Sequence, residues 1–167
     1  MKKISLILIT LSINLFGCKN EKQIANGDKN IEIYKYTYQH NTQNLNEDHY
    51  IVLESNNKSI NGWYYGTSDD FDEAREGYLP GFFVKEMDEL IINNNTIKFK
   101  LNVKFEDCYR SSIPLQYRNS DELPKTFKIW DVGGMTFNPK SYEGTIANGK
   151  IILKNASYER IFYKIVK

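Results

Sequence analysis

The stretch that decides the fold is residues 96–104, which read TIKFKLNVK. Its apolar side chains, Ile97, Phe99, Leu101 and Val103, alternate with polar ones. Successive side chains of a strand point to opposite faces of a sheet, so this pattern predicts a strand with one buried and one solvated face. Such one-sided strands are typical of antiparallel sheets.

Further strand-like runs lie on both sides of this stretch. They occupy residues 31–38, 49–54, 59–67, 82–87, 90–92, 126–130, 142–146, 150–154 and 161–166. The pair Asn148-Gly149 is a strong signal for a type I′ hairpin turn, and the Asn residues at 93–95 tolerate the positive φ that a turn needs. One helical turn is expected over residues 71–76, with Ser68, Asp69 or Asp70 as its cap.

Composition and strand spacing together predict an all-β domain. The 167 residues are 41% hydrophobic and 26% charged, which is ordinary for a globular protein, and 14% are aromatic. We expect a small antiparallel β-barrel or sandwich with at most one short helix. The succession of hairpins favours an up-and-down meander, similar in spacing to small lipocalin-like barrels. Such a likeness of architecture carries no function.

The N-terminal segment has the features of an export signal. Lys2 and Lys3 precede an apolar run that is too short to span a bilayer as a helix and ends at Leu15-Phe16-Gly17-Cys18. This end resembles the lipobox of bacterial lipoproteins. We therefore expect a signal peptide over residues 1–17, a polar tether over residues 18–30 and a single β domain over residues 31–167.

The lipobox resemblance implies a lipid anchor. Cys18 would carry a diacylglycerol after cleavage behind Gly17, and two or three acyl chains hold a protein firmly to a bilayer. The resemblance therefore implies a location in the cell envelope, facing the periplasm or the cell surface. Lys19 at the second mature position favours the outer membrane. The alternative is a plain secretory signal with an unmodified cysteine.

An aromatic and acidic segment, residues 62–83, is the leading candidate for a binding site. Its connection between strands is longer than a hairpin needs, and long ordered loops are often functional. It could form a lid over the barrel mouth, a Ca²⁺ site or a capped turn that plugs the barrel end. A second candidate is the face shared by Tyr34, Tyr36 and Tyr38 in the first predicted strand. These side chains could line a cavity, form a protein-binding stripe on the surface, or pack against neighbouring strands without a binding role. The candidate residues are Tyr34, Tyr36, Trp63, Tyr65, Asp69, Asp70, Asp72, Arg75 and Tyr78.

The expected function is binding without catalysis. No catalytic motif is present, and a pairing of Cys108 with His40 or His49 has no support beyond the residue types. We expect no cofactor and no metal, and the net charge of +1 disfavours nucleic acid as a partner. The partner is expected to be a small apolar or amphipathic ligand, or an envelope component. The alternative is a protein-interaction module, such as a hydrolase inhibitor or an accessory subunit of an outer-membrane complex.

Overall fold

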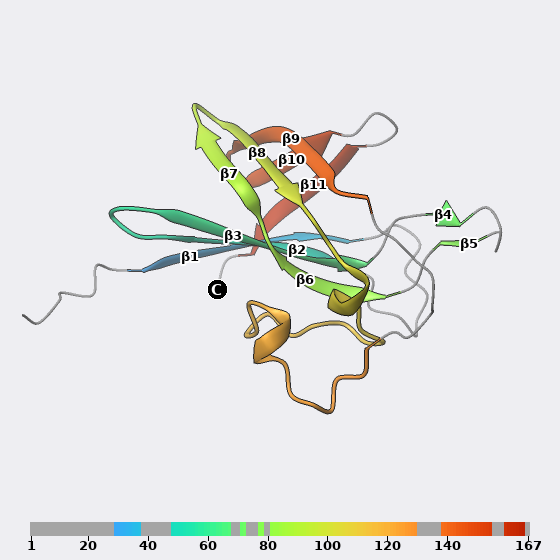
Figure 1. The fold of residues 1–167 in the computed structure, drawn as a ribbon. Coiled ribbons are helices and arrows are strands. Elements are labelled where there is room, and N and C mark those ends of the chain that lie inside the picture. The colour runs from blue at the N-terminus through green and yellow to red at the C-terminus, as the bar shows by residue number, and fades with distance from the viewer. Residues whose placement is uncertain are drawn as a thin grey trace, which may run out of the picture.

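The regular secondary structure of the described residues is almost entirely β-strand (Figure 1). The structure, a computed structural model, describes residues 29–37, 48–67, 71–72, 77–78, 81–129, 138–154 and 159–165. Its strands are β1 (Asn30–Tyr36), β2 (His49–Ser55), β3 (Ile60–Thr67), β4 (Phe71–Asp72), β5 (Gly77–Tyr78), β6 (Phe82–Glu86), β7 (Asp88–Asn93), β8 (Thr96–Leu101), β9 (Lys140–Ala147), β10 (Lys150–Lys154) and β11 (Glu159–Ile165).

Nine of these strands form one antiparallel sheet that curls into a nearly closed barrel. Their order is β6-β3-β2-β1-β11-β10-β9-β8-β7. The two edge strands, β6 and β7, are consecutive in sequence, so a single run of chain pairs with β3 through its first half and with β8 through its second. Met87 lies between the halves and donates its backbone N–H to the carbonyl of Gly62 at 2.8 Å. The predicted antiparallel meander is confirmed.

The two ends of the barrel differ in how the strands are joined. At one end, tight turns join β2 to β3, β7 to β8 and β9 to β10. Asn148 and Gly149 have φ values of 51° and 71°, as the predicted type I′ turn requires, and Asn94 and Asn95 have 45° and 68°. At the other end, residues 37–48, 68–81, 102–139 and 155–158 connect the strands. We call this second end the loop-rich end.

The barrel interior holds the main hydrophobic core. Strand register places Tyr34 opposite Ile51 and Ile51 opposite Tyr64, so these side chains share the inner face. The alternating residues of 96–101 behave as predicted, because Ile97, Phe99 and Leu101 are buried while the lysines between them are exposed. The buried members of this core are Tyr34, Ile51, Leu53, Tyr64, Phe83, Met87, Ile97, Phe99, Leu101, Tyr142, Ile151, Leu153 and Phe162.

Residues 105–129, which we call the strap, lie across the outer face of the β1–β2–β3–β6 part of the sheet (Figure 1). They cover a second core that includes Ile33, Val52, Trp63, Tyr65 and Val84. The strap carries two three-residue 3-10 helices, Phe105–Asp107 and Ser120–Glu122. The strand predicted over residues 126–130 is wrong in its described part, since only an isolated bridge from Ile129 to Tyr109 forms there.

The helical turn predicted over residues 71–76 is also wrong in its described part, residues 71–72. Phe71–Asp72 and Gly77–Tyr78 pair as the short antiparallel strands β4 and β5. Capping residues favour a helix start only when the following residues can bury a helical stripe. Here Phe71 instead pairs with Tyr78 across a ladder, and aromatic residues favour strands.

Candidate functional site

The structure divides the predicted aromatic site residues between two faces of the sheet. Tyr34 is buried in the barrel interior and Tyr36 packs against that core. Trp63 and Tyr65 point the other way and lie beneath the strap. The period of two explains the division, because Trp63 and Tyr65 flank the inward-facing Tyr64. Tyr34 and Tyr36 therefore belong to a different cluster from Trp63 and Tyr65, and the four side chains do not line one site.

Stacked rings occupy the centre of the barrel. The Tyr64 ring centroid lies 5.8–6.4 Å from those of Phe83, Phe99, Tyr142 and Phe162. Phe99 and Tyr142 stack at 5.0 Å. An eight-stranded barrel is just wide enough for side chains to fill, and the continuous run β6–β7 gives this sheet a comparable circumference. The described interior is therefore a packed core.

A polar network is buried next to these rings. His49 is fully buried; its Nδ1 lies 2.7 Å from the Tyr64 hydroxyl, and its Nε2 lies 3.0 Å from Oγ1 of Thr67. The backbone N–H of Thr67 donates to Nε2 at 3.2 Å, which assigns the proton to Nδ1. Arg160, only 5% exposed, donates to the same Tyr64 hydroxyl at 3.1 Å, and its guanidinium lies 5.6 Å from the Tyr36 ring centroid. The network ties β2, β3 and β11 together.

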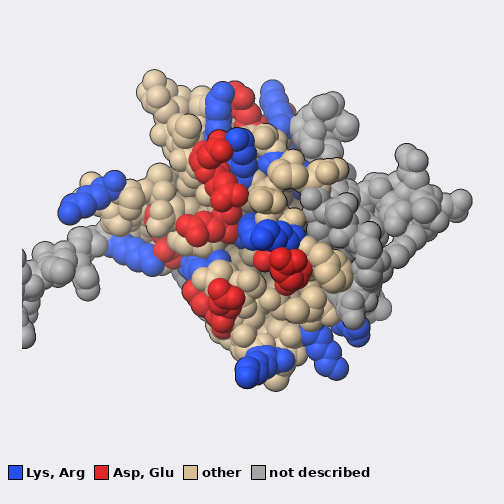
Figure 2. Space-filling view, viewed as in Figure 1, with Lys and Arg blue, Asp and Glu red and all other residues tan. Residues whose placement is uncertain are grey.

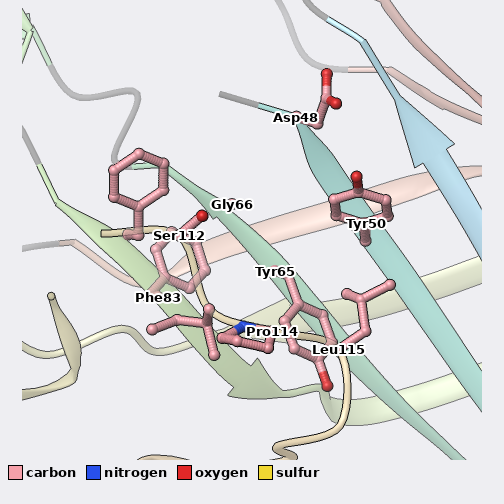
Figure 3. A pocket seen from close by; sticks show the side chains of 10 residues that line it. Asp48, Tyr50, Tyr65, Gly66, Phe83, Ser112, Pro114 and Leu115 are labelled. Carbon is pink, nitrogen blue, oxygen red and sulfur yellow. The ribbon is translucent and has the colours of Figure 1, made fainter. Parts of the chain in front are cut away.

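A small pocket opens between the strap and the sheet at the loop-rich end (Figure 3). Its volume is about 180 Å³. On the sheet side, Tyr50 of β2 and Tyr65 of β3 line the pocket together with Asp48, the residue before β2. The strap closes the other side. The strap residues that line it are Ser112, Ile113, Pro114 and Leu115. The aromatic lining suits a small group with an apolar body, and the one carboxylate of the lining, that of Asp48, is already paired with Lys35 at 2.6 Å.

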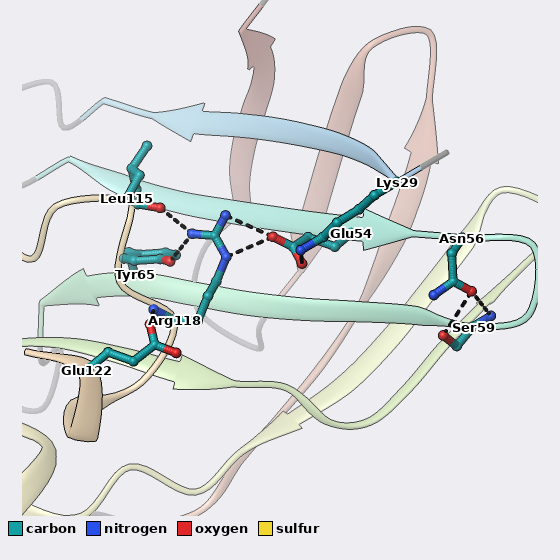
Figure 4. A network of polar contacts seen from close by, with 8 residues as sticks. All are labelled: Lys29, Glu54, Asn56, Ser59, Tyr65, Leu115, Arg118 and Glu122. Carbon is teal, nitrogen blue, oxygen red and sulfur yellow. Dashed lines mark hydrogen bonds and ion pairs between the residues drawn. The ribbon is translucent and has the colours of Figure 1, made fainter. Parts of the chain in front are cut away.

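Arg118 fastens the strap beside this pocket (Figure 4). Its Nε and one terminal nitrogen each lie 2.9 Å from the same carboxylate oxygen of Glu54. The other terminal nitrogen donates to the Tyr65 hydroxyl at 2.9 Å and also to the carbonyl of Leu115. The guanidinium lies 5.4 Å from the Trp63 ring centroid. The Tyr65 hydroxyl donates to the carbonyl of Tyr117 at 2.5 Å, so strap and sheet are joined in both directions.

The charge on Glu54 depends on this arrangement. Burial opposes its ionisation, but hydrogen bonds from Lys29 and Arg118 outweigh burial and hold the pKa of Glu54 below its ordinary value. Lys29 Nζ lies 2.6 Å from the carboxylate oxygen that Arg118 does not contact. Glu54 is thus an ionised anchor for the strap rather than a proton donor or acceptor.

Cys108 is placed as a core residue and not as a nucleophile. It is fully buried, and its thiol lies 3.7 Å from the carbonyl oxygen of Lys104. Burial, with the nearby acids Asp107 and Glu106, raises the pKa of the thiol to about 12. His49 contacts Tyr64 and Thr67 instead of this thiol, and His40 lies outside the described residues.

The acidic candidates of the 68–83 segment are largely beyond the structural description. Asp69, Asp70 and Arg75 lie outside the described residues, as does Cys18, and Asp72 and Tyr78 are described only as members of β4 and β5. Within the described part of the chain, no three His, Cys, Asp or Glu side chains gather to hold a metal ion.

Surface charges of both signs are intermingled on the described surface in view (Figure 2). Ion pairs join neighbouring strands, as between Lys98 and Glu143 at 2.9 Å and between Lys100 and Glu89 at 2.7 Å. The described residues include no helix with the length and apolar character needed to cross a membrane.

Sequence reasoning missed several residues that organise these sites. Arg118, Glu54 and Arg160 are buried or half-buried charges, yet each lies in a stretch where charged residues are common. The available signal was weak: Glu54 and Arg160 each lie in a strand-like run, where a charge next to buried positions calls for a partner. The partners themselves are distant in sequence and could not be named.

Comparisons with known proteins identify no relative. No protein-family model matches the chain, and neither a curated protein nor a solved structure matches it. The function is therefore argued from the geometry above.

Proposed function

We propose that this chain is a lipid-anchored protein of the cell envelope whose β-barrel is a non-catalytic binding module. The lipobox-like residues 15–18 support the anchor at Cys18. Two observations support a role without catalysis: the thiol of Cys108 is buried, and both ring nitrogens of His49 are hydrogen-bonded within the protein, to Tyr64 and Thr67.

The observation that carries the binding role is the pocket beneath the strap. Pockets for drug-sized ligands usually measure about 300–1,000 Å³. At about 180 Å³, this pocket has room for one side chain or a small terminal group of an envelope partner. The ring-filled core around Tyr64 favours this site over storage of a lipid-sized molecule inside the barrel.

A paired substitution on the strap tests the binding role. Ser112 lines the pocket and is exposed, and its exposed neighbour Ser111 does not line it. Ser112→Trp should fill the pocket, whereas Ser111→Trp places the same bulk outside it. Chemical cross-linking in intact envelopes should trap a partner with the parent and with Ser111→Trp, and fail with Ser112→Trp. Equal cross-linking by both variants would refute the pocket as the contact.

A small free ligand in the same pocket is the second candidate, because the tyrosine rings of its lining also suit a small apolar or amphipathic molecule. Native mass spectrometry of the purified chain should then show a bound mass that Ser112→Trp removes.

The lipid anchor at Cys18 is tested separately. The parent should incorporate a palmitate analogue, and Cys18→Ser should neither incorporate it nor fractionate with membranes.

A further inference from the structure

The outer face of β1 and β11 carries apolar side chains that lie in the open. Ile33 pairs with Ile165 and Lys35 pairs with Tyr163, so these side chains share the outer face of the barrel. Tyr163 is 53% exposed, Ile31 46% and Ile165 38%. The strap instead covers Ile33 of β1 and the large apolar side chains on the outer faces of β2 and β3. A cluster of exposed apolar residues on one wall indicates an interaction surface.

A groove runs along this wall. The β1–β11 ladder has only three registered pairs and ends at Lys35 and Tyr163. There the two strands border a groove of about 540 Å³, lined on the β11 side by Ile161, Tyr163 and Ile165. The groove therefore combines apolar side chains with the polar ones of Lys35, Thr37, Glu159 and Lys164, and it is large enough to take more than one side chain or acyl segment.

Lysines surround the groove, and the two that line it are themselves in ion pairs, Lys35 with Asp48 at 2.6 Å and Lys164 with Glu32. Lys35 and Lys164 line the groove, and Lys150 Nζ lies 5.2 Å from the Tyr163 ring centroid. The acids on this side form ion pairs, Glu159 with Lys154 at 3.8 Å and Glu32 with Lys164. An apolar tyrosine-bearing face rimmed by lysines is complementary to the headgroup region of an anionic bilayer.

The predicted tether, residues 18–30, leads directly into β1, one of the two strands of this wall. Asn30 is the first residue of β1, and Ile31 is the second. A polar tether of thirteen residues, from Cys18 to Asn30, would span about 20 Å (root-mean-square) as a flexible coil. A lipid anchor at Cys18 would keep this wall close to the bilayer and give it a high effective concentration there, so a weak apolar contact is enough.

We propose that the outer wall formed by β1 and β11 is the face of the barrel that lies against a lipid surface. Tyr163, Ile165 and Ile31 enter the boundary between headgroups and acyl chains, and the surrounding lysines face lipid phosphates. The proposal rests on the proposed anchor at Cys18, but its test is arranged to be independent of whether that anchor forms.

The test measures the depth of labelled side chains at a membrane. Tyr163→Cys is labelled with an environment-sensitive fluorophore, and Ser112→Cys at the loop-rich end is the matched control. Cys108 should escape labelling because it is fully buried. The lipidated chain is reconstituted in vesicles of phosphatidylethanolamine with a minority of phosphatidylglycerol. If Cys18 carries no lipid, it is replaced by serine so that it takes no label, and the chain is tethered through an N-terminal histidine tag to nickel-chelating lipid.

The label at position 163 should shift its emission to shorter wavelength and be quenched by lipids with nitroxides on their acyl chains, whereas the label at position 112 should do neither. Equal solvent exposure of both labels would overturn the proposal. Burial of the label at 163 without vesicles, growing with protein concentration, would also overturn it, because that result identifies a second copy as the occupant.

A partition measurement adds a second readout that needs no label. In the Cys18→Ser background, Tyr163→Ser combined with Ile165→Ser should weaken vesicle binding by roughly tenfold, from the apolar area withdrawn. Ile91 on β7 is 58% exposed but lies off this wall, so Ile91→Ser should leave binding unchanged. An equal loss with Ile91→Ser would refute the assignment of this face.

Discussion

Replacing Arg118 with Met should release the strap from the barrel and cost a large part of the stability. The guanidinium joins four groups: the Glu54 carboxylate, the Tyr65 hydroxyl, the Leu115 carbonyl and the Trp63 ring. Methionine keeps most of the apolar stem but none of the donors. Glu54, whose side chain is 9% exposed, is then left with Lys29, whose side chain is 60% exposed.

The expected magnitude follows from these contacts. A hydrogen bond to a charged group contributes about 1.5–3 kcal/mol, and removing one partner of a buried ion pair costs about 3–5 kcal/mol. The Arg118 side chain is 20% exposed and Lys29 still compensates part of the charge on Glu54, so the lower end applies. We expect Arg118→Met to lower the free energy of unfolding by about 2–4 kcal/mol.

Urea denaturation at several pH values measures this loss and its origin. The pKa of Glu54 is lowered in the folded state from its ordinary value of 4.5. The stabilisation by its ionised form is therefore fully present above pH 4.5 and is lost as the pH falls through the folded pKa. The difference between parent and Arg118→Met should be largest near neutral pH and shrink in acid.

Lys128→Met is the matched control, because it removes an exposed cation from the same strap. It should change the free energy of unfolding by no more than about 0.5 kcal/mol. A loss by Arg118→Met as small as that of the control, or a loss that does not change with pH, would refute the role of Arg118 as the anchor of the strap.

Three further predictions concern single residues. Gly144→Ala should cost at least about 3 kcal/mol by urea denaturation, since a Cβ would overlap the carbonyl oxygen of Ile152 on the paired strand; near-parental stability would contradict the register of β9 and β10. His49→Gln should cost about 2–4 kcal/mol in the same assay, because it breaks the bonds to Tyr64 and the β3 terminus. Cys108 should not react with a thiol reagent at pH 8 until the protein is unfolded, as burial raises its pKa to about 12; rapid reaction of the native protein would contradict its burial.

Local pattern was enough to predict most strands and turns. The alternation over residues 96–101 and the Asn148-Gly149 turn depend on interactions between near neighbours, and both are confirmed. The predictions for residues 71–76 and 126–130 failed in their described parts, 71–72 and 126–129, for a related reason. Capping residues and β-propensity are weak preferences, and pairing partners elsewhere in the chain override them.

The candidate sites were harder to predict because they join distant parts of the chain. The pocket brings Tyr65 on β3 against Pro114 in the strap, and the strap anchor joins Arg118 to Glu54. No short-range pattern connects these residues. The aromatic richness of residues 62–65 was visible, but it could not show which rings would face the barrel and which the strap.

The order of strands and turns along the chain can be read from the sequence alone, because these features depend on residues a few positions apart. For strands that are apolar on both faces, only the tertiary structure decided which face is inside. In β2, the consecutive residues Ile51, Val52 and Leu53 are all buried. Both faces of this strand are apolar, so its sequence has no alternation that distinguishes the inner face from the outer face. Closure of the sheet buries one face and the strap buries the other, and both events depend on contacts between residues far apart in the chain.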